Sequence, residues 1–470
     1  MGGAERLDRH HALGKLDARQ RVERLLDPGT FDEIGTLVGD VPADAIVAGA
    51  GRIGGRPVMV GAEDFTVLGG TIAGGSNAKR YRIAELALRE RIPLVMLLEG
   101  AGYRQDESGP RGPTDLIVQA QCSGRVPLVT GVLGASAGHG ALIAGISDFA
   151  VMTEQASVFT AGPPVVRESI GEEVTKEDLG GPAVAVRSGL IHNVAVDDPA
   201  ALDEIRRYLS YFPASAWSYP PASESVDAGG RPVPELLGIV PRDNRRVYDM
   251  RAVVDVLFDD GDWLEVAPMF GPAIICALAH LGGESVAVVA NQPNVLAGSV
   301  DTDAAEKAAH FIRVADSFHL PLVFLADNPG MLPGMASERA GILRSGARMF
   351  AAQTTATTVK LHVTLRKAYG FGSMVMALIA HDGQSATFAW PGATLGAMGA
   401  AASSRAMGAT ADVAAQLHQA ELDASYRSAR GLGFDELIDP RETRDVLIAA
   451  LRRARRTGDP APVARVGITP

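Results

Sequence analysis

The chain has little cysteine, less positive than negative charge and no long uninterrupted apolar run, and each shortage excludes a class of protein. Its 470 residues include only 2 cysteines, Cys122 and Cys276, too few for a disulfide framework or a four-thiolate zinc ribbon. We expect both to be small buried residues in a reducing compartment. The 44 Lys and Arg against 55 Asp and Glu give a net charge of −11, whereas a general nucleic-acid binder carries a basic excess. The longest mostly apolar run, residues 131–152, contains five glycines, a histidine and an aspartate, so no membrane helix is expected.

What the chain does contain is typical of a globular protein. Apolar residues make up 47% and charged residues 21%, which allows an ample core. The 53 glycines and 28 prolines indicate many tight turns rather than a plain helix bundle. The N-terminal residues are charged throughout and show no apolar segment of a signal peptide. We therefore expect a cytoplasmic protein that binds neither nucleic acid nor a membrane.

An internal duplication organises the chain. Residues 55–102 align with residues 283–330 at an offset of 228 without a gap, and 14 of the 48 positions are identical. The register continues with residues 159–163 opposite residues 387–391. A proline-rich stretch, residues 219–234, falls where a linker belongs. The sequence therefore predicts two homologous domains, residues 1–225 and 226–470.

Each half alternates strand, helix and strand. In the first half, residues 58–61 and 93–98 are apolar runs typical of buried strands, and residues 77–91 carry apolar side chains at helical spacing. The second half repeats this pattern, with a helix over 304–318 and a strand over 321–326. This order predicts an α/β fold whose sheets are covered by helices.

Two short motifs match functional signatures. Residues 49–54 match G-x-G-x-x-G, but a further strand follows them instead of the helix that a dinucleotide site requires, which favours a hairpin turn. Residues 134–138 match G-x-S-x-G, the nucleophile elbow of serine hydrolases, with Ser136 as the nucleophile. The duplication places Ala368 opposite Ser136, and no recognisable triad context surrounds the acids and histidines that follow. A serine hydrolase is therefore the less favoured alternative.

Both halves share a glycine turn between a strand and a helix, Gly-His-Gly at residues 138–140 and Gly-Phe-Gly at residues 370–372. Such a turn exposes consecutive backbone N–H groups in front of a helix dipole, and one donor of this kind is worth about 3–4 kcal/mol to an oxyanion. In one turn alone, glycine would more simply serve close packing of a helix on a strand. Because the turn is kept in both diverged halves, we favour catalytic roles for Gly138, His139, Phe371 and Gly372.

The remaining signals are weak. The 10 histidines include no H-x-x-x-H or H-x-H pair, so no metal site is expected. The basic cluster at Lys79 and Arg80 is equally consistent with phosphate contact and with an exposed helix face.

Several further segments give the chain a resemblance to a known family. In chain order they are GKLDAR at 14–19, LLDPGTF at 25–31, DFTVLGG at 64–70, EDLGG at 177–181, GLIH at 189–192, NQP at 291–293, PGMLPG at 329–334 and RKAYG at 366–370. In this order and spacing they resemble the carboxyltransferase (β) subunit of biotin-dependent acyl-CoA carboxylases, such as propionyl-CoA carboxylase. The resemblance covers nearly the whole chain.

The resemblance implies two tandem crotonase-like domains of the β-β-α superhelix type, usually assembled in a homo-hexamer core. The N-terminal domain would bind acyl-CoA, with Gly138 and His139 holding the thioester oxygen as an enolate. The C-terminal domain would bind biotin, with Phe371 and Gly372 holding the ureido oxygen. The implied reaction transfers a carboxyl group from carboxybiotin to the α-carbon of a short acyl-CoA of the acetyl- or propionyl-CoA type. Decarboxylation on the same scaffold is the alternative direction.

The resemblance also implies substrates and partners. The chain contains no Ala-Met-Lys-Met biotinylation segment, so biotin would arrive on a separate biotin carboxylase or carrier subunit. The family commonly has Gly-Gly where this chain has Gly138 and His139, and Met374 stands at the position that sets acyl size. The candidate substrate-binding residues are Gly70, Thr71, Lys79, Arg80, Asn291, Gln292 and Met374.

Overall fold

The structure, a computed structural model, describes residues 1–104, 113–223, 227, 229–378, 380, 383–454, 460 and 468. The chain forms two compact units, one built on Met1–Tyr219 and the other on Pro220–Gly458. The boundary expected between residues 225 and 226 lies outside the described residues.

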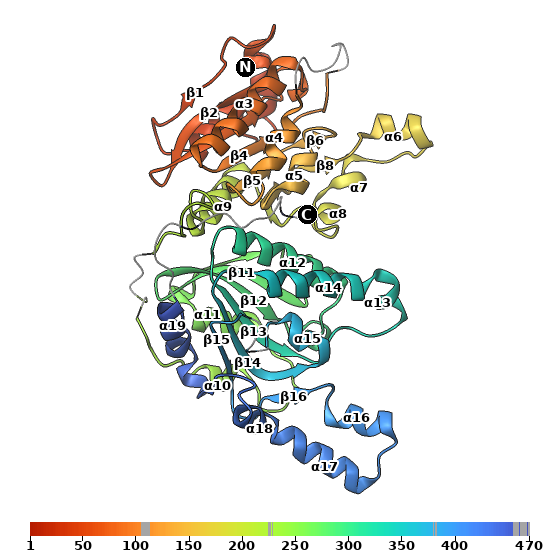
Figure 1. The fold of residues 1–470 in the computed structure, drawn as a ribbon. Coiled ribbons are helices and arrows are strands. Elements are labelled where there is room, and N and C mark those ends of the chain that lie inside the picture. The colour runs from red at the N-terminus through yellow and green to blue at the C-terminus, as the bar shows by residue number, and fades with distance from the viewer. Residues whose placement is uncertain are drawn as a thin grey trace. The chain divides into compact units, whose positions relative to one another are not determined.

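The first unit contains a seven-stranded sheet and a separate two-stranded sheet (Figure 1). In pairing order, the strands of the large sheet are β1 (Asp32–Glu33), β2 (Ile46–Ile53), β3 (Arg56–Glu63), β4 (Leu94–Leu98), β5 (Leu128–Val132), β7 (Phe149–Thr153) and β9 (Asn193–Ala195). The small sheet pairs β6 (Ala135–Ala137) with β8 (Ser157–Phe159). The helices are α1 (Ala4–His11), α2 (Ala18–Leu25), α3 (Gly74–Glu90), α4 (Asp115–Cys122), α5 (Leu142–Ile146), α6 (Pro163–Ile170), α7 (Lys176–Gly180), α8 (Pro182–Ala185) and α9 (Asp198–Tyr211).

The second unit repeats this topology. In pairing order, its strands are β10 (Trp263–Val266), β11 (Ile274–Leu281), β12 (Glu284–Asn291), β13 (Leu322–Asn328), β14 (Lys360–Tyr369), β15 (Ala386–Ala389) and β17 (Glu436–Leu437), and β16 (Thr394–Gly396) pairs with the end of β14. Its helices are α10 (Leu236–Ile239), α11 (Met250–Leu257), α12 (Thr302–Ser317), α13 (Met335–Ala340), α14 (Ile342–Thr355), α15 (Gly370–Val375), α16 (Ala400–Met407), α17 (Ala411–Leu422), α18 (Ala424–Arg430) and α19 (Thr443–Ala454).

The duplication extends to the backbone conformation. The strands β2, β3 and β4 and the helix α3 begin 228 residues before β11, β12, β13 and α12. The two hairpins turn at Gly-Gly pairs, residues 54–55 and 282–283, whose φ values of 56° and 76°, and 62° and 83°, are those that glycine adopts without a steric cost. The left-handed residues Arg91 and His319, with φ of 57° and 61°, also correspond. The predicted α/β fold and the duplication are confirmed, and residues 49–54 form a strand and hairpin as expected.

In the first unit, helices cover both faces of the large sheet. Alternate side chains of β4 point to opposite faces, as in any strand. Leu94, Met96 and Leu98 join a buried cluster with Ile83 of α3. On the other face, a methyl group added to Gly131 would lie 3.1 Å from both Leu97 of β4 and Ile205 of α9. Because β4 is buried on both faces, its sequence is a continuous apolar run, and that run is the pattern that predicted this strand.

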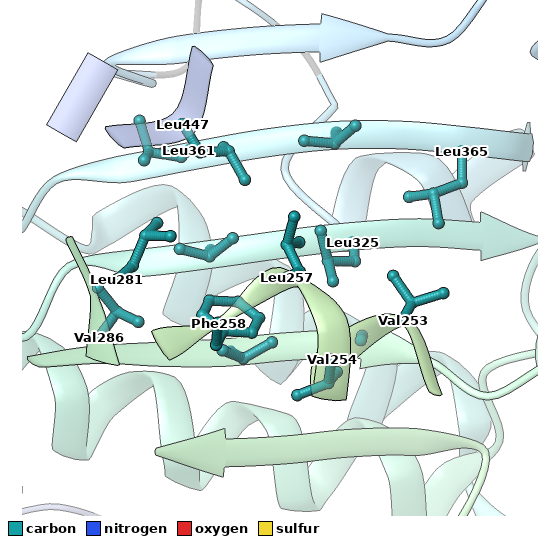
Figure 2. Packing of buried hydrophobic residues seen from close by; sticks show 14 of the residues in the cluster. Val253, Val254, Leu257, Phe258, Leu281, Val286, Leu325, Leu361, Leu365 and Leu447 are labelled. Atoms are coloured by element: carbon teal, nitrogen blue, oxygen red, sulfur yellow. The ribbon is translucent and has the colours of Figure 1, made fainter. Parts of the chain in front are cut away.

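The core of the second unit packs α11 and α19 against one face of its sheet. Val253, Val254 and Leu257 recur at helical spacing along α11, and Figure 2 shows them within one cluster with Leu325 of β13 and Leu361 of β14. Full burial of such a side chain contributes roughly 1.5–3 kcal/mol. This packing holds β13 and β14, whose ends carry the second glycine turn.

Candidate active site

The first glycine turn joins β6 to α5. Gly138 has a φ of 58°, in the left-handed region that favours glycine, and its own N–H donates to the carbonyl oxygen of Phe159 at 3.0 Å. Among the described residues, none accepts a hydrogen bond from the backbone N–H of His139 or Gly140. Gly138 therefore supplies the backbone conformation, and His139 supplies an available donor.

A buried ionic network contacts this turn through the side chain of His139. Asp115 of α4 bonds to His139 Nε2 through Oδ1, and Arg80 Nε donates to its Oδ2 at 2.8 Å. Arg80 Nη1 also donates to Glu63 Oε1 at 2.7 Å. Burial alone would raise the pKa of Asp115, but the Arg80 charge and the hydrogen bond from His139 lower it to about 2. Asp115 is therefore an anion that fixes the orientation of the His139 ring, and Tyr103 lies edge-on to that ring at 5.9 Å.

The second glycine turn follows β14 and begins α15. Gly370 has a φ of 53°, matching that of Gly138. The N–H groups of Phe371 and Gly372 belong to the first turn of α15, which offers them no partner, and no described residue outside the helix accepts from them. A methyl group at Gly372 would lie 2.4 Å from Asn328 Oδ1 and 2.6 Å from Gly330 Cα, so only glycine fits there.

Each turn lies near a buried acid at the end of a core strand. In the first unit the carboxylate of Glu99 forms ion pairs with two cations: its Oε1 lies 2.7 Å from Lys15 Nζ, and its Oε2 lies 2.6 Å from Arg21 Nη1. Burial would raise the pKa of Glu99, but the charges of Arg21 and Lys15 hold it below its usual value. In the second unit Asp327 accepts from Arg366 Nε at 2.7 Å and from the Tyr248 hydroxyl at 2.9 Å. These buried pairs hold the ends of β4 and β13, which lie beside the turns: the carbonyl oxygen of Gly100 accepts from the N–H of Ala137 at 3.0 Å, and Asn328 pairs with Ala368.

The two acids are also anchored through equivalent backbone hydrogen bonds. Glu63 Oε2 accepts from the N–H of Glu99 at 2.8 Å, and Asn291 Oδ1 accepts from the N–H of Asp327 at 3.1 Å. Glu63 and Asn291 are the last residues of β3 and β12, so the duplication has kept the bond while changing the acceptor.

Several predicted substrate-binding residues have internal partners. Lys79 Nζ donates to the carbonyl oxygens of Ile46 at 2.5 Å and Ala43 at 3.1 Å, and burial lowers the pKa of Lys79 to about 8. Arg80 is fully buried in the network described above. The charged heads of both residues thus have structural partners, and their contact with a phosphate stays a prediction.

The remaining candidates lie beside the turns or within the sheets. A methyl group at Gly70 would lie 2.3 Å from the Glu99 carbonyl oxygen, so this glycine allows a close backbone approach. Asn291 and Gln292 are fully buried, and Gln292 Oε1 accepts from the N–H of Met250 at 3.1 Å. Thr71 and Met374 are half-buried and keep surface that a ligand can reach. Substrate binding by these residues also stays a prediction.

Ser136 does not have the geometry of a nucleophile. It lies inside β6, is fully buried, and its Oγ has no hydrogen-bond partner among the described residues. A nucleophile elbow instead exposes its hydroxyl to a histidine. The hydrolase alternative is therefore not favoured.

Sequence reasoning missed the acids that support the turns. Glu99 and Asp327 occupy equivalent positions of the ungapped repeat, so comparing its acidic positions could have found them. Asp115 lies beyond residues 55–102, the part of the first half that aligns without a gap, and no pattern pointed to it. Within the described ranges there is no cluster of three His, Cys, Asp or Glu residues placed to hold a metal, and no helix with the length and apolarity that a membrane crossing needs.

Comparison with known proteins identifies the family to which this chain is related. Residues 9–462 match the family model described as the carboxyl transferase domain. The chain is 36% identical to the methylmalonyl-CoA carboxyltransferase 12S subunit of Propionibacterium freudenreichii subsp. shermanii, over 96% of this chain and 90% of that subunit. It is 35% identical to the mitochondrial propionyl-CoA carboxylase beta chain of Sus scrofa, over 97% and 89%. It is 32% identical to the methylmalonyl-CoA decarboxylase subunit alpha of Propionigenium modestum, over 100% and 96%.

Solved structures support the same relationship. The crystal structure of the transcarboxylase 12S hexamer, with methylmalonyl-coenzyme A bound, superposes with a TM-score of 0.91 at 36% identity, covering 98% of this chain and 94% of that one. The predicted crotonase-like fold is confirmed by this match.

Proposed function

Because the chain belongs to the carboxyl transferase domain family, a family of transferase enzymes, we propose that it moves a carboxyl group from carboxybiotin to the α-carbon of a short acyl-CoA. The observation that carries this proposal is the pair of glycine turns, each at the same place in a duplicated unit and each with backbone N–H groups available to a ligand. A carboxyl transfer through an enolate develops negative charge on two oxygens, one on each reactant. Two such turns can stabilise both negative charges through backbone N–H groups, without an acid–base pair of side chains.

We assign the first turn to the acyl-CoA and the second to biotin. The N–H of His139 would hold the thioester oxygen, with Gly138 setting the turn. The N–H groups of Phe371 and Gly372 would hold the ureido oxygen of biotin. Release of CO2 from carboxybiotin would leave negative charge on the ureido oxygen, which would take the α-proton of the acyl-CoA. The electron pair of the broken C–H bond would leave an enolate with its charge on the thioester oxygen, and the enolate would attack the carbon of CO2. Holding both reactants close supplies much of the remaining rate enhancement.

Thr71 and Met374 are the substrate-binding candidates with accessible surface. Met374 lies two residues beyond Gly372 on α15, and Gln353 Nε2 donates to its carbonyl oxygen at 3.0 Å. The contact fixes the backbone of Met374 and leaves its apolar side chain to pack against an acyl chain. Biotin would come from a separate biotin carboxylase or carrier subunit. The hexameric relative supports a homo-hexameric core for this chain as well.

The test is a carboxyl-transfer assay with acetyl-, propionyl- and butyryl-CoA, each with and without a biotinylated carrier domain that bears a labelled carboxyl group. We expect labelled carboxyacyl-CoA only when the carrier is present. Product formed from labelled bicarbonate without biotin would contradict the proposal. Because one relative is a methylmalonyl-CoA decarboxylase subunit, the same mixtures are also run in reverse. Biotin-dependent loss of the carboxyl group from methylmalonyl-CoA measures the decarboxylation direction.

A further inference from the structure

The first turn carries an ionisable side chain that the proposed function does not use. His139 lies at the centre of the turn, and its counterpart in the second unit is Phe371. The His139 side chain keeps 17% of its surface exposed, whereas Asp115, its partner, is fully buried. An imidazole held by a buried carboxylate is the arrangement by which proteins orient a general base.

The contacts of the ring determine which nitrogen is available. Asp115 is an anion with acceptors only, so Nε2 of His139 carries the proton and donates to Asp115 Oδ1. In the neutral ring Nδ1 then holds the lone pair. Among the described residues, none bonds to Nδ1.

Covalent geometry limits how far Nδ1 of His139 can lie from the backbone N–H assigned to the oxyanion. Nδ1 is joined to the His139 backbone nitrogen through only three carbon atoms, Cγ, Cβ and Cα. That backbone N–H is the donor assigned to the thioester oxygen, and the α-carbon of an acyl-CoA is two bonds from that oxygen. A base at Nδ1 and a donor at the backbone nitrogen therefore belong to the same residue.

The surroundings keep the pair in place. Arg80 Nε and Gln119 Nε2 donate to Asp115 Oδ2 at 2.8 Å and 2.7 Å, so the carboxylate that holds His139 cannot rotate away without breaking both bonds. The single positive charge of Arg80 is also shared between the buried carboxylates of Asp115 and Glu63. The network therefore fixes the side chain of His139 as well as the turn that carries it.

We propose that His139, oriented by Asp115, is a general base that removes and returns the α-proton of bound acyl-CoA without biotin. This proposal rests on the binding of acyl-CoA at the first turn. In the step, the α-C–H bond breaks, its electron pair forms the enolate, and Nδ1 takes the proton to give an imidazolium that Asp115 stabilises. In heavy water the Nδ1 proton exchanges with solvent, and a deuteron returns to the α-carbon. No oxidant, reductant or co-reactant is required.

The experiment follows deuterium incorporation at the α-carbon of propionyl-CoA in heavy water, by mass spectrometry, with no biotin present. Carboxyl transfer from a carboxylated carrier is measured separately on the same preparations. His139→Phe installs the residue of the second turn, and His139→Gln keeps a hydrogen-bond donor for Asp115 but cannot accept an α-proton as imidazole does. Ser136→Ala, three residues earlier, is the matched control because its hydroxyl has no partner.

A positioned general base contributes about 10²–10⁴-fold, so we expect the exchange rate of both His139 variants to fall by about 100-fold or more. Ser136→Ala should exchange as the wild type does. Carboxyl transfer should fall far less than exchange in at least His139→Gln. Absence of exchange in a wild-type enzyme that transfers carboxyl groups, or equal exchange in the variants, would overturn the proposal. A proportional loss of exchange and transfer in both variants would also overturn it, since His139 would then only position the turn. A wild-type enzyme that neither binds acyl-CoA nor transfers carboxyl groups would instead refute the proposed function itself.

Discussion

Replacing Gly372 by alanine tests whether the second turn binds an oxyanion. The added methyl group would lie 2.4 Å from Asn328 Oδ1 and 2.6 Å from Gly330 Cα. Ordinary contacts between such atoms are about 3.5–4.0 Å, so the start of α15 must move by about 1 Å relative to the end of β13. Asn328 cannot easily yield, because its Oδ1 accepts from the Gly330 N–H at 3.0 Å and its Nδ2 donates to Asn291 Oδ1 at 3.1 Å.

The same 1 Å displacement moves the N–H groups of Phe371 and Gly372 away from the oxygen they are proposed to hold. A misplacement of this size costs about 100-fold in rate. Overpacking of this kind also lowers stability by about 1–3 kcal/mol, which leaves a domain of this size folded. We therefore expect the kcat of carboxyl transfer to fall by about 100-fold, while the Kd of acyl-CoA, whose thioester the other turn would hold, changes far less, through the contact of Met374 with the acyl chain.

The assay combines carrier-dependent transfer, calorimetric titration of acyl-CoA and a denaturant melt. Gly238→Ala is the matched control, because Gly238 is an exposed helical residue of the same unit with no atom within 4 Å of the added methyl group. Gly372→Ala with wild-type kcat would refute the assignment of this turn. A loss of acyl-CoA affinity equal to the loss of rate would refute the division of labour between the turns.

Four further predictions concern the buried groups. Ser136→Ala removes a hydroxyl that has no hydrogen-bond partner among the described residues. We therefore expect the activation free energy of carboxyl transfer and the free energy of unfolding to stay within about 0.5 kcal/mol of wild type. Loss of activity would instead support Ser136 as a nucleophile. Arg366→Met leaves Asp327 buried without its closest cation. The free energy of unfolding, measured in a denaturant melt, should fall by about 3–5 kcal/mol. A change below about 1 kcal/mol would contradict a stabilising ion pair. Asp115, with its pKa lowered from 3.8 to about 2, contributes stability above pH 4 that is lost as the pH falls through about 2. Burial lowers the pKa of His362 from 6.5 to about 4, so the unfolded chain takes up its proton first and the melting temperature should fall from pH 6.5 to 4. His362→Gln should remove that upper part of the pH dependence, and an unchanged profile would contradict it.

The repeat made most of the fold predictable. Two copies with one ungapped register predict the same strands and helices twice, and the expected strand at 93–98 is β4, Leu94–Leu98. Apolar periodicity was sufficient because these strands and helices are buried on defined faces. The boundaries shifted by up to three residues, since caps such as Asp301, whose side chain accepts from the N–H of Ala304, set the helix start.

The site was less predictable than the fold. The glycine turns were found because glycine is required at a positive φ or a close approach, and such positions are visible in sequence. The partners of Lys79 were not found, because the basic cluster gave no sign that this ammonium group turns inward to two carbonyl oxygens. Asp115 was missed for a similar reason: its role depends on a meeting with His139, 24 residues along the chain, that only the tertiary fold creates.

Under the proposed function, the two turns give a duplicated site two tasks. Backbone N–H groups do not depend on the side chain of the residue that carries them, so both copies keep their donors whatever residue stands at the centre of the turn. The central position is therefore free to diverge. In the second unit it holds Phe371, whose ring lies 5.5 Å from that of Phe350. In the first unit it holds His139, bonded to the buried anion Asp115. The chemical difference between the two turns thus lies in the partner that each central side chain meets, one apolar and one charged.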